Sequence, residues 1–212
     1  MTSTSQTRRA LDIDVSELPD VAFHSGSLIW WGTSGMMLAE GTMFALSIMT
    51  YFYLRTLNPM WPPPTVRQPT LLLPTINLAL LCASVIPFIL SDKAAEKGDV
   101  GKTRLYLLLG IVAALLFLYF RVLDWRSLNY RWDSHAYGSI CWALIIFHTG
   151  HVLASSVETM VILALTYFKP LEGHIRVDIQ CDTLYWWFIV LAWVPIYIIV
   201  YVLPHLHGNY LL

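Results

Sequence analysis

The segment His135–Phe168, HAYGSICWALIIFHTGHVLASSVETMVILALTYF, holds a single charged side chain, Glu158, in 34 residues. A helix needs about 20 mostly apolar residues to cross the hydrocarbon layer of a membrane. At a rise of 1.5 Å per residue this segment would reach about 50 Å, so we expect it to tilt or to protrude. The segment therefore predicts a transmembrane helix, not an element of a water-soluble domain.

Four further apolar stretches accompany it: Leu28–Leu54, Leu71–Leu90, Leu105–Phe120 and Thr183–Pro204. Among the 13 Lys and Arg and the 14 Asp and Glu residues of the chain, only Glu40 and Glu158 fall within the five stretches. Charged residues make up 13% of the composition, whereas a soluble domain averages about a quarter. We predict an all-α polytopic membrane protein, with a polar N-terminal tail over residues 1–27 and a bundle of five transmembrane helices within residues 28–212.

The orientation in the membrane follows from the Lys and Arg residues of the short connecting segments, which are more frequent on the cytoplasmic side. One side carries eight: Arg8, Arg9, Lys93, Lys97, Lys102, Arg104, Lys169 and Arg176, the last two in a predicted loop over residues 169–182. The other side carries five: Arg55, Arg67, Arg121, Arg126 and Arg131. We therefore expect the N-terminus in the cytoplasm and the C-terminus outside. The segment Asn58–Pro69, with three consecutive prolines after Trp61, should form a non-helical outer loop.

Several classes of function are disfavoured by what the chain contains. The net charge is −1 and the basic residues are scattered, so no basic face for nucleic acid is expected. Cys82, Cys141 and Cys181 are far apart and form no CxxC or CxxCH motif. There is no glycine-rich phosphate loop, HExxH motif or Ser-His-Asp arrangement. We therefore predict no catalytic residue and no metal or cofactor held by this chain alone.

Glu40 is the first candidate for a functional residue. It lies near the middle of the first stretch, with its nearest charged neighbours, Asp20 and Arg55, at least fifteen residues away. A carboxylate in a membrane helix is costly and is by default a hypothesis about function. It must be either protonated or paired from another helix. A protonated carboxyl bonded at a helix contact and a proton-handling or lipid-contacting role both fit.

The fourth stretch carries a polar stripe of His148, His151, Ser155 and Glu158, spaced by three, four and three residues. Heptad spacing of this kind places side chains along one face of a helix, which we expect to face protein or a hydrated cleft. Three interpretations fit the stripe: a network of interhelical hydrogen bonds, a proton or ion path, and a metal or haem site. The last has only two histidine ligands on this helix.

From about Leu28 to Pro204 the chain resembles subunit III of the haem–copper terminal oxidases. The motifs that carry the resemblance occur in the order typical of that family: Leu38–Phe44 (LAEGTMF), Trp61–Pro64 (WPPP), Leu73–Asn77 (LPTIN), Glu96–Asp99 (EKGD), Tyr137–Ser139 (YGS), Phe147–Val152 (FHTGHV) and Tyr185–Trp186. The family is built from two helices, a V-shaped cleft that holds phospholipid, and five further helices. Here the first two helices are missing, as in several bacterial members, so one wall of the cleft would come from another subunit.

The resemblance implies a non-catalytic accessory subunit of the bacterial inner membrane. It would pack against the catalytic subunit I and subunit II, bind phospholipid and support proton uptake, while haem and copper reside in the catalytic partner. Glu40 matches the buried acid of the family, and His148 and His151 match its paired histidines. Glu158 is a candidate from helical geometry alone.

The last stretch departs from the family pattern. Gln180 stands where a glutamate is common, Trp187 at the position of a histidine and Val190 at that of an aspartate; Asp124, before this stretch, also replaces a common glutamate. Two alternatives remain open: an independent proton or ion carrier that uses the polar stripe, and the homologous accessory subunit of a nitric oxide reductase. A carrier would typically show repeated halves, and no internal repeat is evident.

Overall fold

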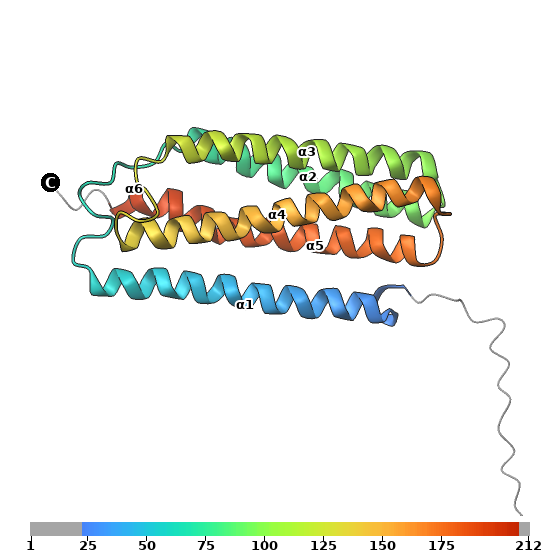
Figure 1. Cartoon of the computed structure of the whole chain (residues 1–212), viewed down its shortest axis with the longest axis horizontal. Coiled ribbons are helices and arrows are strands. Elements are labelled where there is room, and N and C mark those ends of the chain that lie inside the picture. Colours follow the sequence, from blue (N-terminus) through green and yellow to red (C-terminus); the bar gives the residue numbers. More distant parts are fainter. Residues whose placement is uncertain (1–22, 208–212) are drawn as a thin grey trace, which may run out of the picture.

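Helices make up almost the whole of the computed structural model, which describes residues 23–207 (Figure 1). Five helices are long and apolar enough to cross a membrane: α1 (Leu28–Leu57), α2 (Leu72–Glu96), α3 (Val100–Ser127), α4 (Ala136–Phe168) and α5 (His174–Tyr197). Three short elements complete the order: η1 (His24–Gly26), η2 (Ile198–Val202) and α6 (Leu203–His207). No strand occurs within the described range. The predicted all-α, five-helix architecture is confirmed, whereas most of the predicted tail lies outside the described residues.

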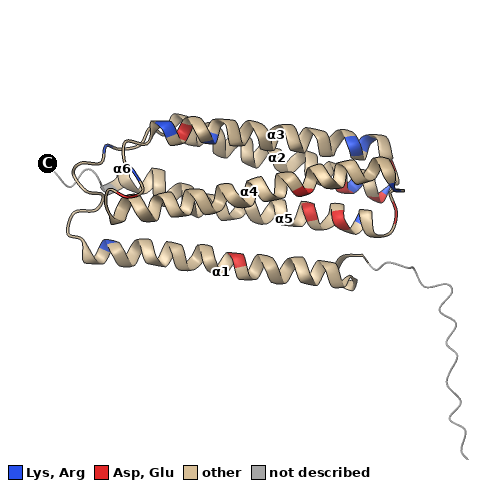
Figure 2. Ribbon diagram, viewed as in Figure 1, with Lys and Arg blue, Asp and Glu red and all other residues tan. Residues whose placement is uncertain are grey.

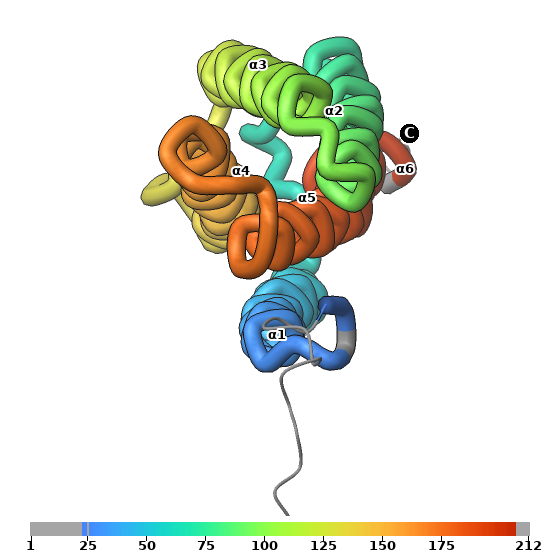
Figure 3. The backbone as a smooth tube through the Cα atoms, turned by 90° about the vertical axis from the view of Figure 1, so that its right-hand side faces the viewer, coloured from blue at the N-terminus to red at the C-terminus, as the bar shows by residue number. Residues whose placement is uncertain are grey.

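The helices α2 to α5 form a ring, and α1 lies outside it against α4 and α5 (Figure 3). Successive helices alternate in direction (Figure 1). We call the end where α1 begins the N-terminal end of the bundle and the opposite end the C-terminal end. Only Phe44 and Tyr51 of α1 are buried, whereas α5 buries residues along its whole length. The fifth helix is therefore the centre of the fold, and α1 is attached to it by a narrow strip.

Four of the helices, all but α4, are longer than the apolar stretches that predicted them. The prediction of a loop over residues 169–182 is wrong for most of that range, because α5 begins at His174. Arg176, Asp178 and Asp182 interrupt the apolar pattern but do not prevent helix formation, because their neighbours on α5 are buried against the bundle. Helix α3 likewise continues through Arg121 and Asp124. The predicted outer loop Asn58–Pro69 is confirmed as non-helical.

The type of the last helix changes three residues after Pro195. Proline lacks the N–H that the helix ladder needs and its ring clashes with the carbonyl four residues earlier. The helix continues past it as a π-helical turn, η2, before α6. Such turns arise where the regular ladder is interrupted and are frequent at functional sites. This wider turn carries Tyr201, whose side chain is buried inside the ring.

The turn from α2 to α3 is closed by Gly98 and Asp99. Gly98 adopts a φ of 69°, which glycine accepts without strain. Asp99 caps α3: its carboxylate accepts a hydrogen bond of 3.0 Å from the Lys102 backbone N–H and lies 2.8 Å from Lys102 Nζ. These contacts with Lys102 hold the pKa of the Asp99 carboxyl below its ordinary value.

A group whose pKa is lowered by folding stabilises the fold above its ordinary value, about 3.9 for Asp, and loses that effect as the pH falls through the lowered pKa. Amide hydrogen exchange at Lys102 should therefore accelerate as the pH is lowered through this range, beyond the intrinsic pH dependence of exchange. In Asp99→Asn the amide oxygen still accepts the hydrogen bond but does not titrate, so the excess pH dependence should disappear. An identical pH profile in both proteins would contradict this role of the carboxylate.

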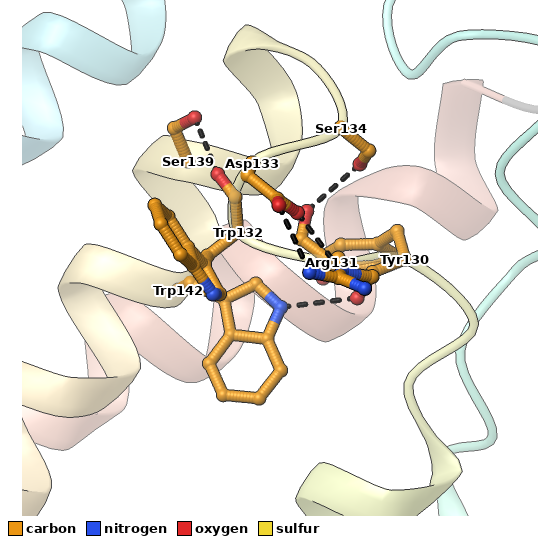
Figure 4. A network of polar contacts seen from close by, with 7 residues as sticks. All are labelled: Tyr130, Arg131, Trp132, Asp133, Ser134, Ser139 and Trp142. Carbon is orange, nitrogen blue, oxygen red and sulfur yellow. Dashed lines mark hydrogen bonds and ion pairs between the residues drawn. The ribbon is translucent and has the colours of Figure 1, made fainter.

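Hydrogen bonds from side chains, to one another and to the backbone of the loop, hold the α3–α4 loop (Figure 4). Arg131 forms two hydrogen bonds of 3.0 Å with Asp133. Trp142 Nε1 donates a hydrogen bond of 3.1 Å to the carbonyl oxygen of Tyr130. The Ser139 hydroxyl donates one of 2.7 Å to the carbonyl oxygen of Trp132. The start of α4 and the preceding loop therefore form one unit at the C-terminal end.

Candidate functional site

Glu40 lies where α1 meets α4 and α5, about midway along α1. Its Oε2 accepts a hydrogen bond of 2.8 Å from the Tyr185 hydroxyl of α5, and its Oε1 lies 3.6 Å from His151 Nε2 of α4. The side chains of His151 and Glu40 are 18% and 23% exposed. Both partners come from other helices, as expected for a carboxyl group with no partner in its own helix. Polar contacts of this kind can hold a helix that buries little surface.

The hydrogen bond on the other side of the His151 ring fixes its tautomer. Nδ1 lies 2.5 Å from the carbonyl oxygen of Phe147. A carbonyl only accepts, so Nδ1 carries the hydrogen and Nε2, facing Glu40, is the nitrogen that gains or loses a proton. A single proton shared by Glu40 and His151 gives a neutral pair whether it sits on the carboxyl group or as the second proton of the imidazolium. A proton can therefore move between Glu40 and His151 without a change in the net charge of the pair.

His148, in contrast, points into the ring of helices. It is fully buried, and its Nε2 lies 3.0 Å from the carbonyl oxygen of Ile189 on α5. Its ring centroid is 4.6 Å from that of Trp193. By the argument used for His151, Nε2 carries the hydrogen of this bond, which links α4 to α5. The two histidines of the sequence motif thus occupy different environments, and only His151 contacts Glu40.

The other two residues of the polar stripe, Ser155 and Glu158, also differ in their burial. Ser155 is buried beside α5, whereas Glu158 is exposed. Glu158 forms no hydrogen bond or ion pair with any residue between 23 and 207, but the charge of Asp178 acts on it, and its own charge acts on Tyr185, the donor to Glu40. The structure therefore brings Glu40 and His151 together, places Glu158 in their electrostatic neighbourhood, and separates His148 from them.

Asp182 is an acidic residue that the sequence analysis did not identify. It is fully buried on α5, and the Thr159 hydroxyl of α4 lies 3.0 and 3.1 Å from its two carboxylate oxygens, within reach to donate to either. Its position beyond the apolar stretch hid it, since residues 169–182 were predicted as a loop. The spacing of Asp178, Asp182 and Tyr185 by four and three residues places all three on one helical face and could have revealed them. Figure 2 shows acidic positions on α4 and α5 in the N-terminal half of the bundle.

A buried ion pair near the C-terminal end was also not predicted. Arg121 and Asp124 of α3 are both inside the ring, with Arg121 Nη1 3.3 Å from Asp124 Oδ2. The guanidinium lies over the Trp193 ring, 3.7 Å from its centroid, and the Tyr201 hydroxyl donates to Asp124. The sequence analysis had assigned Arg121 to a connecting segment. Its three-residue spacing from Asp124 was the available signal for a pair on one helix.

No three His, Cys, Asp or Glu side chains between residues 23 and 207 come together in a way that could hold a metal ion.

The three residues of α5 that depart from the family pattern differ in their burial and in their contacts. Gln180 accepts from the His24 backbone N–H at 2.9 Å, and its amide nitrogen lies 2.9 Å from His24 Nε2. Trp187 is exposed, and Val190 is buried. Gln180 therefore ties the segment before α1 to α5.

Comparisons with known proteins agree along nearly the whole described chain. The family model for Cytochrome c oxidase subunit III matches residues 23–204. A cytochrome c oxidase subunit 3 of Thermostichus vulcanus is 24% identical over 171 residues, covering 79% of this chain and 83% of the relative. Probable subunits 3 of Nocardia farcinica and of Mycobacterium tuberculosis (strain ATCC 25618 / H37Rv) are 27% and 25% identical, each covering 83% of this chain and 85% of the relative. The chain belongs to the cytochrome c oxidase subunit III family.

Proposed function

We propose that the chain is a non-catalytic accessory subunit of a haem–copper oxidase. It stabilises the complex, binds phospholipid and supports proton uptake, while subunit I and subunit II carry the haem and copper chemistry of oxygen reduction. Membership of the family supports the assembly with other oxidase subunits. The observation that carries the proton role is the contact of Glu40 with Tyr185 and His151 in the middle of the membrane span.

We place the chain in the bacterial inner membrane, with the N-terminal end of the bundle at the cytoplasmic face. This orientation follows from the excess of Lys and Arg in the segments at that end. Glu158, Asp178 and Asp182 then lie between the cytoplasmic face and Glu40, along α4 and α5. Acidic side chains in a membrane span mark proton paths when they line a route between water and a buried site. The proposed role is to collect protons at the cytoplasmic face for the neighbouring catalytic subunit.

Replacing Glu40 with glutamine tests this role. The amide accepts the hydrogen bond from Tyr185 but holds no titrating proton, so the complex should assemble with full haem content and a near-normal initial rate of oxygen reduction. Activity should then decline faster than in the wild type during sustained turnover. The measurement is oxygen consumption by the affinity-purified complex over many turnovers, with haem quantified from the reduced-minus-oxidised spectrum.

Thr42→Val is the matched control, because Thr42 is exposed on α1 and, among residues 23–207, its hydroxyl bonds only to the carbonyl of Ala39. An oxidase that is inactive from its first turnover in Glu40→Ala, at full haem content, would overturn the accessory role. Proton flux in liposomes containing this chain alone would instead support an independent carrier. Haem bands together with nitric oxide turnover and no oxygen turnover would assign the chain to a nitric oxide reductase.

A further inference from the structure

An apolar groove runs along the membrane-facing side of α3 and α4, away from Glu40. It has a volume of about 440 Å³ and is lined by Leu108 and Ile111 of α3 and by Met160, Leu163, Ala164 and Tyr167 of α4. This volume lies within the range typical of small-molecule sites, about 300–1,000 Å³. Every one of these side chains is apolar except for the Tyr167 hydroxyl. The lining therefore fits a hydrocarbon chain.

A positive charge lies at one end of this groove. The guanidinium of Arg104 is 4.1 Å from the centroid of the Tyr167 ring, which itself lines the groove. Arg104 precedes Leu108 by four residues and Ile111 by seven, so the three lie on one face of α3. The charged group thus continues the line of the groove toward the N-terminal end of the bundle.

Arg104 is held in place by Thr166 and has no ion-pair partner among residues 23–207. Its Nε donates to Thr166 Oγ1 at 3.2 Å, and Nη2 donates to the Thr166 carbonyl. No carboxylate within residues 23–207 forms an ion pair with it. Nη1 has no hydrogen-bond partner in the same part of the chain and remains able to donate. An arginine held by its edge in this way presents a preorganised donor to phosphate.

The end of α4 adds the features of a membrane interface. Tyr167 and Phe168 are 64% and 85% exposed, and Lys169 follows them directly. Aromatic side chains of this kind collect at the level of lipid headgroups, with basic residues just beyond them. The groove therefore extends from the headgroup layer into the hydrocarbon layer, with Arg104 at the boundary.

We propose that the α3–α4 groove is a binding site for one anionic diacyl phospholipid, with an acyl chain along Leu108, Leu163 and Ala164 and its phosphate at Arg104. The proposal rests on the lipid-binding part of the proposed function and names its site and headgroup class. It does not depend on Glu40 or on proton uptake.

A second groove on the same bundle provides an internal control. It lies between α2 and α3, has a volume of about 330 Å³, and is lined by residues that include Ala83, Pro87, Leu109 and Ala113. No Lys or Arg is among its lining residues. It should accept acyl chains without a preference for the headgroup.

The test is native mass spectrometry of the full chain in mild detergent, titrated with phosphatidylglycerol or with phosphatidylcholine of the same acyl chains. Wild type should bind the first phosphatidylglycerol more tightly than the first phosphatidylcholine. Arg104→Gln should weaken the phosphatidylglycerol adduct about fivefold, as expected for one basic residue near an anionic headgroup, and leave the phosphatidylcholine adduct unchanged. Ala164→Phe, which fills the groove, should weaken both adducts.

Two matched variants should leave the first phosphatidylglycerol adduct unchanged. Lys93→Gln removes an exposed positive charge at the same end of the bundle, and Ala113→Phe fills the second groove. Equal weakening by Arg104→Gln and Lys93→Gln would show general surface attraction and overturn the site. So would an Ala164→Phe variant that binds both lipids as the wild type does.

Arg104→Lys separates the charge from the structural bonds to Thr166. It should keep the preference for phosphatidylglycerol, and if it behaves as Arg104→Gln the proposed phosphate contact is wrong. The proposed function is measured independently, by haem content and oxygen turnover of the purified complex. A loss of lipid selectivity in an otherwise assembled and active oxidase would overturn the lipid site alone, and colourless chain that still selects phosphatidylglycerol would overturn only the oxidase role.

Discussion

Arg121→Met is expected to lower the free energy of unfolding of the chain by about 3–5 kcal/mol, the usual cost of removing one partner from a buried ion pair. The variant leaves the Asp124 carboxylate inside the helix ring with the Tyr201 hydroxyl as its remaining hydrogen-bond donor. It also removes the cation that lies over the Trp193 ring. The measurement is equilibrium unfolding of the purified chain in mixed detergent micelles.

The double variant Arg121→Met with Asp124→Leu should recover most of this loss, because well-packed apolar residues often replace a buried ion pair without a net cost. The recovery distinguishes an uncompensated charge from a simple packing defect, which a second substitution would make worse. Arg126→Met is the control on the same helix, since Arg126 is exposed and should change stability little. A loss below about 1 kcal/mol in Arg121→Met would show that Asp124 is protonated and needs no cation.

Gly138→Ala should destabilise the chain by about 1–3 kcal/mol, as expected for overpacking at a close contact. A Cβ atom at this position would lie 2.4 Å from the carbonyl oxygen of Arg131. The obstacle is backbone, held within the loop by Ser134, whose hydroxyl donates to that same carbonyl at 2.8 Å (Figure 4). The methyl group can be accommodated only if the loop moves and its hydrogen bonds rearrange.

Gly150→Ala on the same helix provides the matched control. No atom lies within 4 Å of a Cβ built there, and alanine favours a helix over glycine by up to about 1 kcal/mol. This variant should therefore be neutral or more stable in the same unfolding measurement. If the two variants behave alike, the loop yields freely and its hydrogen bonds do not constrain the start of α4.

The number and type of the helices could be predicted because each apolar stretch is long enough to cross a membrane by itself. Their ends could not, because a charged residue ends an apolar pattern without ending a helix. Asp182 and Arg121 lie well inside helices since each finds a partner there, Thr159 and Asp124 respectively. Which helix faces become buried depends on how the helices pack together, so the sequence alone does not show that these partners are available.

The site could be predicted in part for the same reason. Glu40 was identified because it is a lone carboxyl group in an apolar stretch, but Tyr185 carries no such signal. His148 and His151 are three residues apart, which turns the second histidine about 60° from the first around the helix axis. That angle is enough for one to enter the ring of helices while the other faces α1. The spacing in the sequence predicts that the four polar residues lie along one side of α4. Which of them face the ring and which face α1 depends on where α1 packs.

The narrow attachment of α1 has a consequence for biosynthesis. Of the five long helices, this one is made first, but His151 and Tyr185, the partners of Glu40, belong to the fourth and fifth. During most of translation the carboxyl group of Glu40 has none of its final contacts. The docking of α1 at this site is therefore complete only after α5 has entered the membrane. The Glu40 site thus marks a bundle whose five helices have all been inserted.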